Sequence, residues 1–104
     1  MVSVDGRGRV ADRAVLRVLG WVPGDRLEVR ALESAVLVRR RSDGIFAVTG
    51  QGYVRLPVAA RRWCGLYAGD RVLLVADRGV LVVHTMGSVA ALVADRHEAL
   101  GVGA

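Results

Sequence analysis

One seven-residue pattern occurs twice in the chain, first as Val4-Asp5-Gly6-Arg7-Gly8-Arg9-Val10 and again as Val48-Thr49-Gly50-Gln51-Gly52-Tyr53-Val54. Both copies follow Val-x-Gly-x-Gly-x-Val. A second pattern comes after each copy at almost the same distance, as Gly20-x-x-x-Gly24-Asp25-Arg26 and then as Gly65-x-x-x-Gly69-Asp70-Arg71. Self-similarity at a nearly constant spacing is the signature of an internal repeat. We therefore expect a duplication of one β-β-α-β-β unit.

Each copy is expected to contain the same five elements. Two short strands flank a turn bounded by glycines, where a positive φ costs little. A short helix then ends at Gly20 or Gly65, because glycine commonly terminates helices, and a hairpin closes the unit. The expected ranges are 2–4, 9–11, 13–19, 26–31 and 35–39 in the first copy, and 45–48, 53–56, 57–64, 71–76 and 80–84 in the second. Residues 72–75 are apolar throughout, which predicts a strand covered on both faces.

A four-stranded unit of about 40 residues cannot bury its own apolar faces, whereas two such units packed together can. We therefore expect a mostly β fold with short helices. In it, repeats 1–41 and 45–84 form one pseudo-twofold β-barrel, and residues 39–44 connect them.

Residues 85–104 are expected to form a C-terminal helical tail. Ser88 is a residue type that caps helices, and four apolar residues after it fall on one helical face: Val89, Leu92, Val93 and Leu100. This tail could dock on its own barrel, or residues 88–100 could bind a second copy or another protein.

Composition restricts the class of protein. No stretch of 18 or more apolar residues occurs although 53% of the chain is hydrophobic, so we expect no membrane span and no membrane partner. The N-terminus has no apolar leader, which indicates a cytoplasmic location. Cys64 is alone, so it forms neither an intramolecular disulfide nor a cysteine metal cluster.

The positive charge is concentrated in the body of the chain. All fifteen basic residues are arginine, against ten acidic residues, for a net charge of +5. Residues 1–41 hold nine arginines and five acids, residues 45–84 hold five and two, and the tail from residue 85 has a net charge of −1. A basic body attracts nucleic-acid phosphates, although solubility alone would also favour it.

The second copy resembles the AbrB/MazE/SpoVT-type swapped-hairpin DNA-binding domain. The matching residues are Gly52-Tyr53-Val54-Arg55-Leu56-Pro57, Ala60-Arg61-Arg62, Gly65-Leu66 and Gly69-Asp70-Arg71-Val72. The first copy keeps Asp5-Gly6-x-Gly8-Arg9-Val10, Leu16-Arg17, Leu19-Gly20 and Pro23-Gly24-Asp25-Arg26-Leu27. It has Asp12-Arg13 in place of the family's Ile-Pro pair. Together the matches cover residues 2–84. The resemblance implies a swapped-hairpin barrel, which the family usually forms from two chains.

The resemblance also implies which arginines approach DNA. Carried over by position, these are Arg9, Arg17, Arg61 and Arg62. Arg7 and Arg55 are added because they lie in the first turn and just after the second. A guanidinium group can hold a phosphate, or the O6/N7 edge of guanine, with two hydrogen bonds. Alternatively, these arginines are solvated surface.

Other candidates indicate structure more than chemistry. Trp21, Trp63 and Tyr67 flank the helix ends and are expected to anchor the core, and Cys64 to be a small core residue. His84 and His97 have no partner at ligand spacing, so we expect neither a metal nor a cofactor. The serines have no base within local reach, and no catalytic constellation is visible.

Three functions remain open. The favoured one is a sequence-selective transcriptional regulator that binds double-stranded DNA. The alternative is an antitoxin that represses its own operon and holds a toxin through residues 88–100. An enzymatic or scaffolding barrel is the third, and without catalytic residues we expect that the protein is not an enzyme.

Overall fold

The computed structural model describes residues 2–10 and 12–87, and the fold there is mostly β with two short helices. The helices are α1 (Arg13–Leu19) and α2 (Val58–Cys64). The strands are β1 (Val2–Ser3), β2 (Arg9–Val10), β3 (Arg26–Ala31), β4 (Ala35–Arg40), β5 (Phe46–Ala47), β6 (Val54–Arg55), β7 (Arg71–Asp77) and β8 (Val80–Thr85). Their order matches the expected one, and both helices lie within one residue of their expected bounds.

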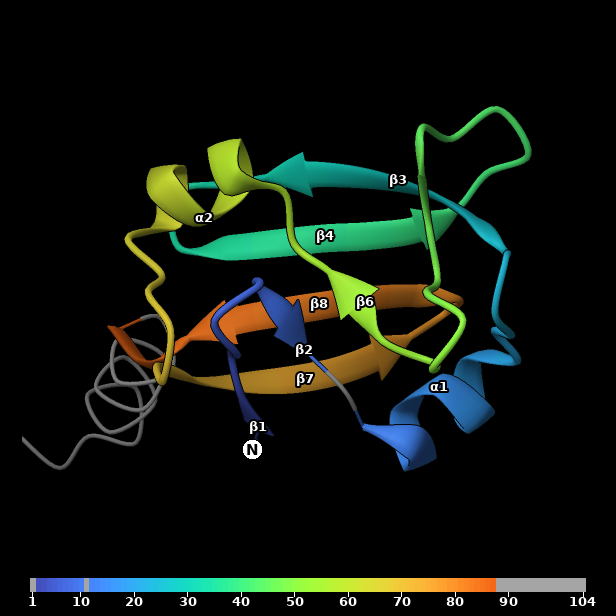
Figure 1. The fold of residues 1–104 in the computed structure, drawn as a ribbon, viewed down its shortest axis with the longest axis horizontal. Coiled ribbons are helices and arrows are strands. Elements are labelled where there is room, and N and C mark those ends of the chain that lie inside the picture. Colours follow the sequence, from blue (N-terminus) through green and yellow to red (C-terminus); the bar gives the residue numbers. More distant parts are fainter. Residues whose placement is uncertain (1, 11, 88–104) are drawn as a thin grey trace, which may run out of the picture.

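Six strands form one antiparallel sheet that curls into a half-barrel, in the order β1-β7-β8-β4-β3-β5 (Figure 1). The separate pair β2–β6 overlies this sheet in the same view. Helix α2 contacts β3 and β4, whereas α1 contacts β7. The space between these layers is filled by one cluster of buried residues: Val4, Val10, Leu16, Trp21, Leu27, Val36, Val38, Val48, Val54, Leu56, Ala60, Leu66, Val72, Leu81 and Val83.

The two halves of the chain pair with each other reciprocally. Strand β1 pairs with β7, and its counterpart β5 pairs with β3. The same exchange appears in single hydrogen bonds: the Val4 amide donates to the Asp70 carbonyl at 2.8 Å, and the Val48 amide donates to the Asp25 carbonyl at 3.0 Å. Exchanging β1–β4 with β5–β8 leaves the strand order of the sheet unchanged.

The helices begin differently and end alike. The Asp12 carboxylate caps α1 by accepting hydrogen bonds from the amides of Ala14 and Val15, whereas Pro57 precedes α2 without a side-chain cap. Both helices end at a glycine in the left-handed region, Gly20 (φ 71°) or Gly65 (φ 67°). This confirms the expected helix ends.

Several burial predictions need correction. Trp21 is buried as expected, but Trp63 and Tyr67 are 69% and 74% exposed and do not anchor the core. The strand containing residues 72–75 is not covered on both faces, because Val75 is 37% exposed on the outer face of the sheet. Alternation explains this: Val72 points into the core, so the odd-numbered residues of β7 point away from it.

Neither helix in the described ranges is long and apolar enough to cross a bilayer. The C-terminal helical tail is expected over residues 85–104. Met86 and Gly87 have helical backbone, and residues 88–104 lie outside the described residues.

Candidate nucleic-acid interface

The β2–β6 pair places two arginines side by side. Arg9 is directly opposite Arg55 in the antiparallel register, and Val10 is opposite Val54. Both valines are buried in the core, so the two arginines share the outward face of the pair. Like charges directly opposite one another destabilise a strand pair. The two guanidinium groups therefore repel each other, and a carboxylate or another anion beside them reduces this repulsion.

Asp5 organises the turn that joins β1 to β2. Its Oδ1 accepts hydrogen bonds from the amides of Arg7 at 2.9 Å and Arg9 at 2.8 Å, and its Oδ2 accepts one from Arg9 Nε at 2.6 Å. The hydrogen bond from the Arg9 amide is the main cause that lowers the pKa of the Asp5 carboxyl group. Sequence reasoning missed this role, although aspartate in a glycine-containing turn commonly binds the backbone that follows it.

Arg9 is also fixed by an aromatic ring from the other half. Its guanidinium carbon lies 5.0 Å from the centroid of the Tyr53 ring. A guanidinium over an aromatic face at this distance is a cation–π contact. In the repeat alignment Tyr53 occupies the position of Arg9. The second copy therefore has an aromatic ring at this position, and the ring supports the arginine of the first copy.

Arg61 reaches the first turn from α2. Its Nε donates to the Leu56 carbonyl at 3.0 Å, and its side chain fills the space beside Gly8, where a Cβ would collide with it. Arg55 Nε in turn donates to the Arg7 carbonyl at 3.2 Å. Arg7, Arg9, Arg55 and Arg61 therefore converge on one turn, and we call them the first-turn cluster.

Arg17 lies apart from that cluster, across the β2–β6 pair. With Arg13 it lines a groove of about 560 Å³ between α1 and residues 51–53, whose other walls include Leu16 and Trp21. In the repeat alignment Leu16 occupies the position of Arg61, and Leu16 is buried in the core. The groove beside the second turn, at residues 51–53, is therefore open, whereas the Arg61 side chain fills the equivalent space beside Gly8 in the first turn.

Arg62 is exposed on α2, and within the described residues no hydrogen bond or ion pair links it to the first-turn cluster. The structure thus brings together four of the six arginines that the sequence singled out. It places Arg17 and Arg62 on the helices beside them.

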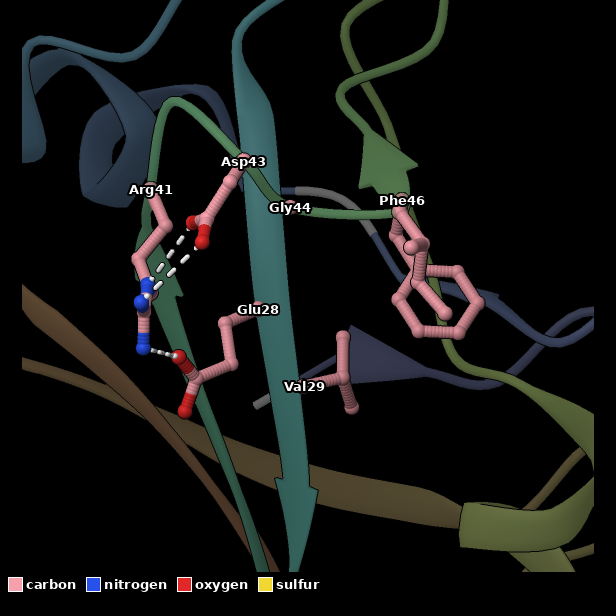
Figure 2. Close-up of a pocket in the computed structure, with 7 residues that line it drawn as sticks. Glu28, Val29, Arg41, Asp43, Gly44 and Phe46 are labelled. Carbon is pink, nitrogen blue, oxygen red and sulfur yellow. Dashed lines mark hydrogen bonds and ion pairs between the residues drawn. The ribbon is translucent and has the colours of Figure 1, made fainter.

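The connector arginines belong to a different network. Glu28 Oε2 accepts a 2.7 Å hydrogen bond from Arg41, which also binds Asp43 at 3.0 Å, so Arg41 lies between two carboxylates (Figure 2). Glu28 also pairs with Arg39 at 3.3 Å. The hydrogen bond from Arg41 is the main cause that lowers the pKa of Glu28. These carboxylates offset the charge of the connector, which leaves it less suited to bind phosphate than the first-turn cluster.

The described part of the chain holds no group of three or more His, Cys, Asp or Glu side chains that could bind a metal ion. Cys64 packs against the core, as expected for a small apolar residue, and its Sγ lies 3.4 Å from the Leu32 carbonyl oxygen. Burial raises the pKa of the Cys64 thiol. A thiol with a raised pKa is a poor nucleophile, because the thiolate is the reactive form.

Comparison with known proteins assigns no family to this chain, because no protein-family model, curated protein or solved structure matches it.

Proposed function

We propose that the protein is a transcriptional regulator that binds double-stranded DNA sequence-selectively. The observation that carries this proposal is the facing pair Arg9 and Arg55 on the outward side of β2–β6. Among the described residues Arg55 has no ion pair with an acidic side chain, and Arg9 has one, with Asp5. Two facing guanidinium groups with one carboxylate between them keep donors that can hold a phosphate or a guanine edge.

We also interpret the fold as a pseudo-twofold swapped-hairpin barrel of the AbrB type, made by one chain instead of two. The reciprocal pairing of β1 with β7 and β5 with β3 supports this interpretation. The two sides of such a barrel would differ, since the first-turn cluster occurs on one side and the α1 groove on the other. Unequal half-sites imply that the preferred DNA sequence need not be a palindrome.

The four clustered arginines would have different tasks on DNA. Arg7 and Arg55 are exposed, so their guanidinium groups are available for phosphate contacts. Arg9 is held by Asp5 and Tyr53, which favours a single geometry and therefore base reading over general attraction. Arg61 uses Nε on the Leu56 carbonyl, which leaves its terminal nitrogens to donate.

Selection of bound fragments from a genomic duplex library, followed by anisotropy titration at several salt concentrations, tests this proposal. Affinity is expected to fall steeply with salt, and Arg55→Ala is expected to reduce the slope of log K against log salt by roughly one unit, as for one lost phosphate contact. Arg78→Ala is the matched control, because Arg78 is 94% exposed in the β7–β8 turn, outside the cluster. Undetectable binding at low salt, or equal effects of both variants, would overturn the proposal.

A further inference from the structure

An apolar hollow lies beside the exposed indole of Trp63. The hollow measures about 450 Å³ and, besides Trp63, is lined by Val29, Ala31, Phe46, Pro57, Ala59 and Ala60. Every one of these side chains is apolar. Figure 2 shows two of them, Val29 and Phe46, close together on the opposite side of β3 from Glu28. An exposed tryptophan at the edge of an apolar hollow is typical of a surface that another segment covers.

Small side chains create this hollow. In the other half of the repeat, Val15 stands at the position of Ala60 and Leu74 at that of Val29, and both of these larger residues pack against the core. The α2 side of the molecule therefore has smaller side chains at both positions, which leaves the hollow unfilled. It has gained Trp63 there, at the position where the first half has Val18.

The described chain ends beside the C-terminal end of α2, the helix that carries Trp63. Met86 and Gly87 line a cavity together with Cys64 and Gly65, which are the last residue of α2 and its C-cap. The Thr85 amide donates to the Ser34 carbonyl at 3.2 Å and so fixes the exit of β8 beside the same end of the helix. Residue 88 therefore directly follows two residues that line a cavity together with the C-terminal end of α2.

The remaining sequence has the length and the pattern to cover the hollow. Residues 88–104 would span about 25 Å as a helix, against about 10 Å for the seven residues of α2. Their apolar residues recur at helical spacing: Val89, Leu92, Val93 and Leu100.

We propose that residues 88–100 cover the Trp63 hollow of their own chain, with this apolar face against the indole and the alanines of α2. This proposal does not rest on the proposed DNA binding. A second copy of the chain is the competing occupant of the hollow. Binding of a second copy depends on protein concentration, whereas a contact within one chain does not.

Limited proteolysis of the full chain tests the proposal, because Arg96 is the only arginine or lysine after residue 87. Trypsin cleavage there releases residues 97–104, which mass spectrometry quantifies. Trp63→Ala and Ala59→Arg both alter exposed positions, so the fold is kept while the tail is released. Each is expected to raise the cleavage rate about 5- to 30-fold, since cleavage follows the population of the open form.

Matched controls separate this effect from general loosening. Tyr67→Ala removes another exposed aromatic side chain that does not line the hollow, and it is expected to leave the rate unchanged. Within the tail, Leu92→Asp is expected to raise the rate, whereas Ala91→Asp, on the opposite side of the helical pattern, is not. Wild-type rates in Trp63→Ala and Ala59→Arg would overturn the proposal. Protection that disappears on hundredfold dilution would also overturn it, in favour of a second copy.

Discussion

Two charged side chains, Asp5 and Arg61, hold the first turn. Asp5 binds the amides of Arg7 and Arg9, and Arg61 fills the space beside Gly8 while it binds the Leu56 carbonyl. Arg61 therefore acts first as a positioning residue. The turn it supports carries the arginines that we propose to meet DNA, so its substitution affects both stability and binding.

Because Gly8 has no side chain, the Arg61 side chain can lie close to its backbone. Replacing Gly8 therefore measures how much this close packing contributes to stability. Gly8→Ala introduces a Cβ at φ +76° that meets Arg61, whereas Gly52→Ala introduces one at φ +83° with nothing within 4 Å. The left-handed backbone costs about 1–2 kcal/mol in each variant. Gly8→Ala is expected to cost about 1 kcal/mol more, because Arg61 must move and lose its hydrogen bond to Leu56. Urea unfolding followed by circular dichroism gives both values, and equal losses would contradict the positioning role.

The lowered pKa of Asp5 predicts a pH dependence. The Asp5 carboxyl group binds a proton at a higher pH in the unfolded chain than in the folded one, so its hydrogen bonds stabilise the fold above the ordinary carboxyl pKa. This contribution to the free energy of unfolding is lost as the pH falls below about 4. Asp5→Asn cannot titrate, so it is expected to lose less stability than the wild type between pH 7 and pH 3. Asp77→Asn, in the exposed β7–β8 turn, is the control and is expected to follow the wild type in urea melts. If Asp5→Asn lost as much stability as the wild type between pH 7 and pH 3, this account would be contradicted.

The two helices are equal in length but differ in how they begin, and this difference can be tested at α1. Asp12→Ala removes the side-chain cap of a seven-residue helix and is expected to cost about 1 kcal/mol in the free energy of unfolding. Asp12→Asn keeps an oxygen that can accept the same two hydrogen bonds, so it is expected to be nearly neutral. Thermal or urea unfolding distinguishes them, and similar losses for both would show that charge, not capping, is what Asp12 contributes.

The order and type of elements could be predicted because local chemistry determines them. Gly20 and Gly65 end the helices through their positive φ, and alternation in residues 26–31 indicates a half-buried strand. Convergence of Arg7, Arg9, Arg55 and Arg61 could not be predicted residue by residue, since it depends on the β2–β6 register between the two halves. That pairing joins positions 46 residues apart.

Burial was harder to predict at the helix ends and on the outer sheet face. A helix of two turns offers too few residues for its apolar stripe to be located. The sequence therefore predicts Trp63 in the core, although its side chain faces solvent. An apolar run such as residues 72–75 has no alternation, and periodicity cannot then show which face is open. Both errors fall on apolar residues, whose type alone does not determine whether they are covered.

At the scale of the whole molecule, symmetry in the backbone coexists with asymmetry in the side chains. The halves exchange equivalent strands, yet Arg61 fills one side of the β2–β6 pair while Leu16 leaves a groove of about 560 Å³ on the other. Two halves within one chain can differ in this way, because a dimer of identical chains must present the same residues twice.

The exchange of strands also predicts that neither half folds alone. A fragment 1–43 would lack β7, the partner of β1, and a fragment 44–104 would lack β3, the partner of β5. Each would also expose its share of the single core. We expect no cooperative urea transition from either fragment alone, and recovery of β-sheet circular dichroism and of a buried Trp21 emission when the two are mixed. An intact chain with a protease-cleavable insertion after Asp43 is the control, since added loop length costs little and cleavage yields the same halves already assembled. A cooperative transition in one isolated fragment would show that the repeats are independent domains rather than two parts of one core.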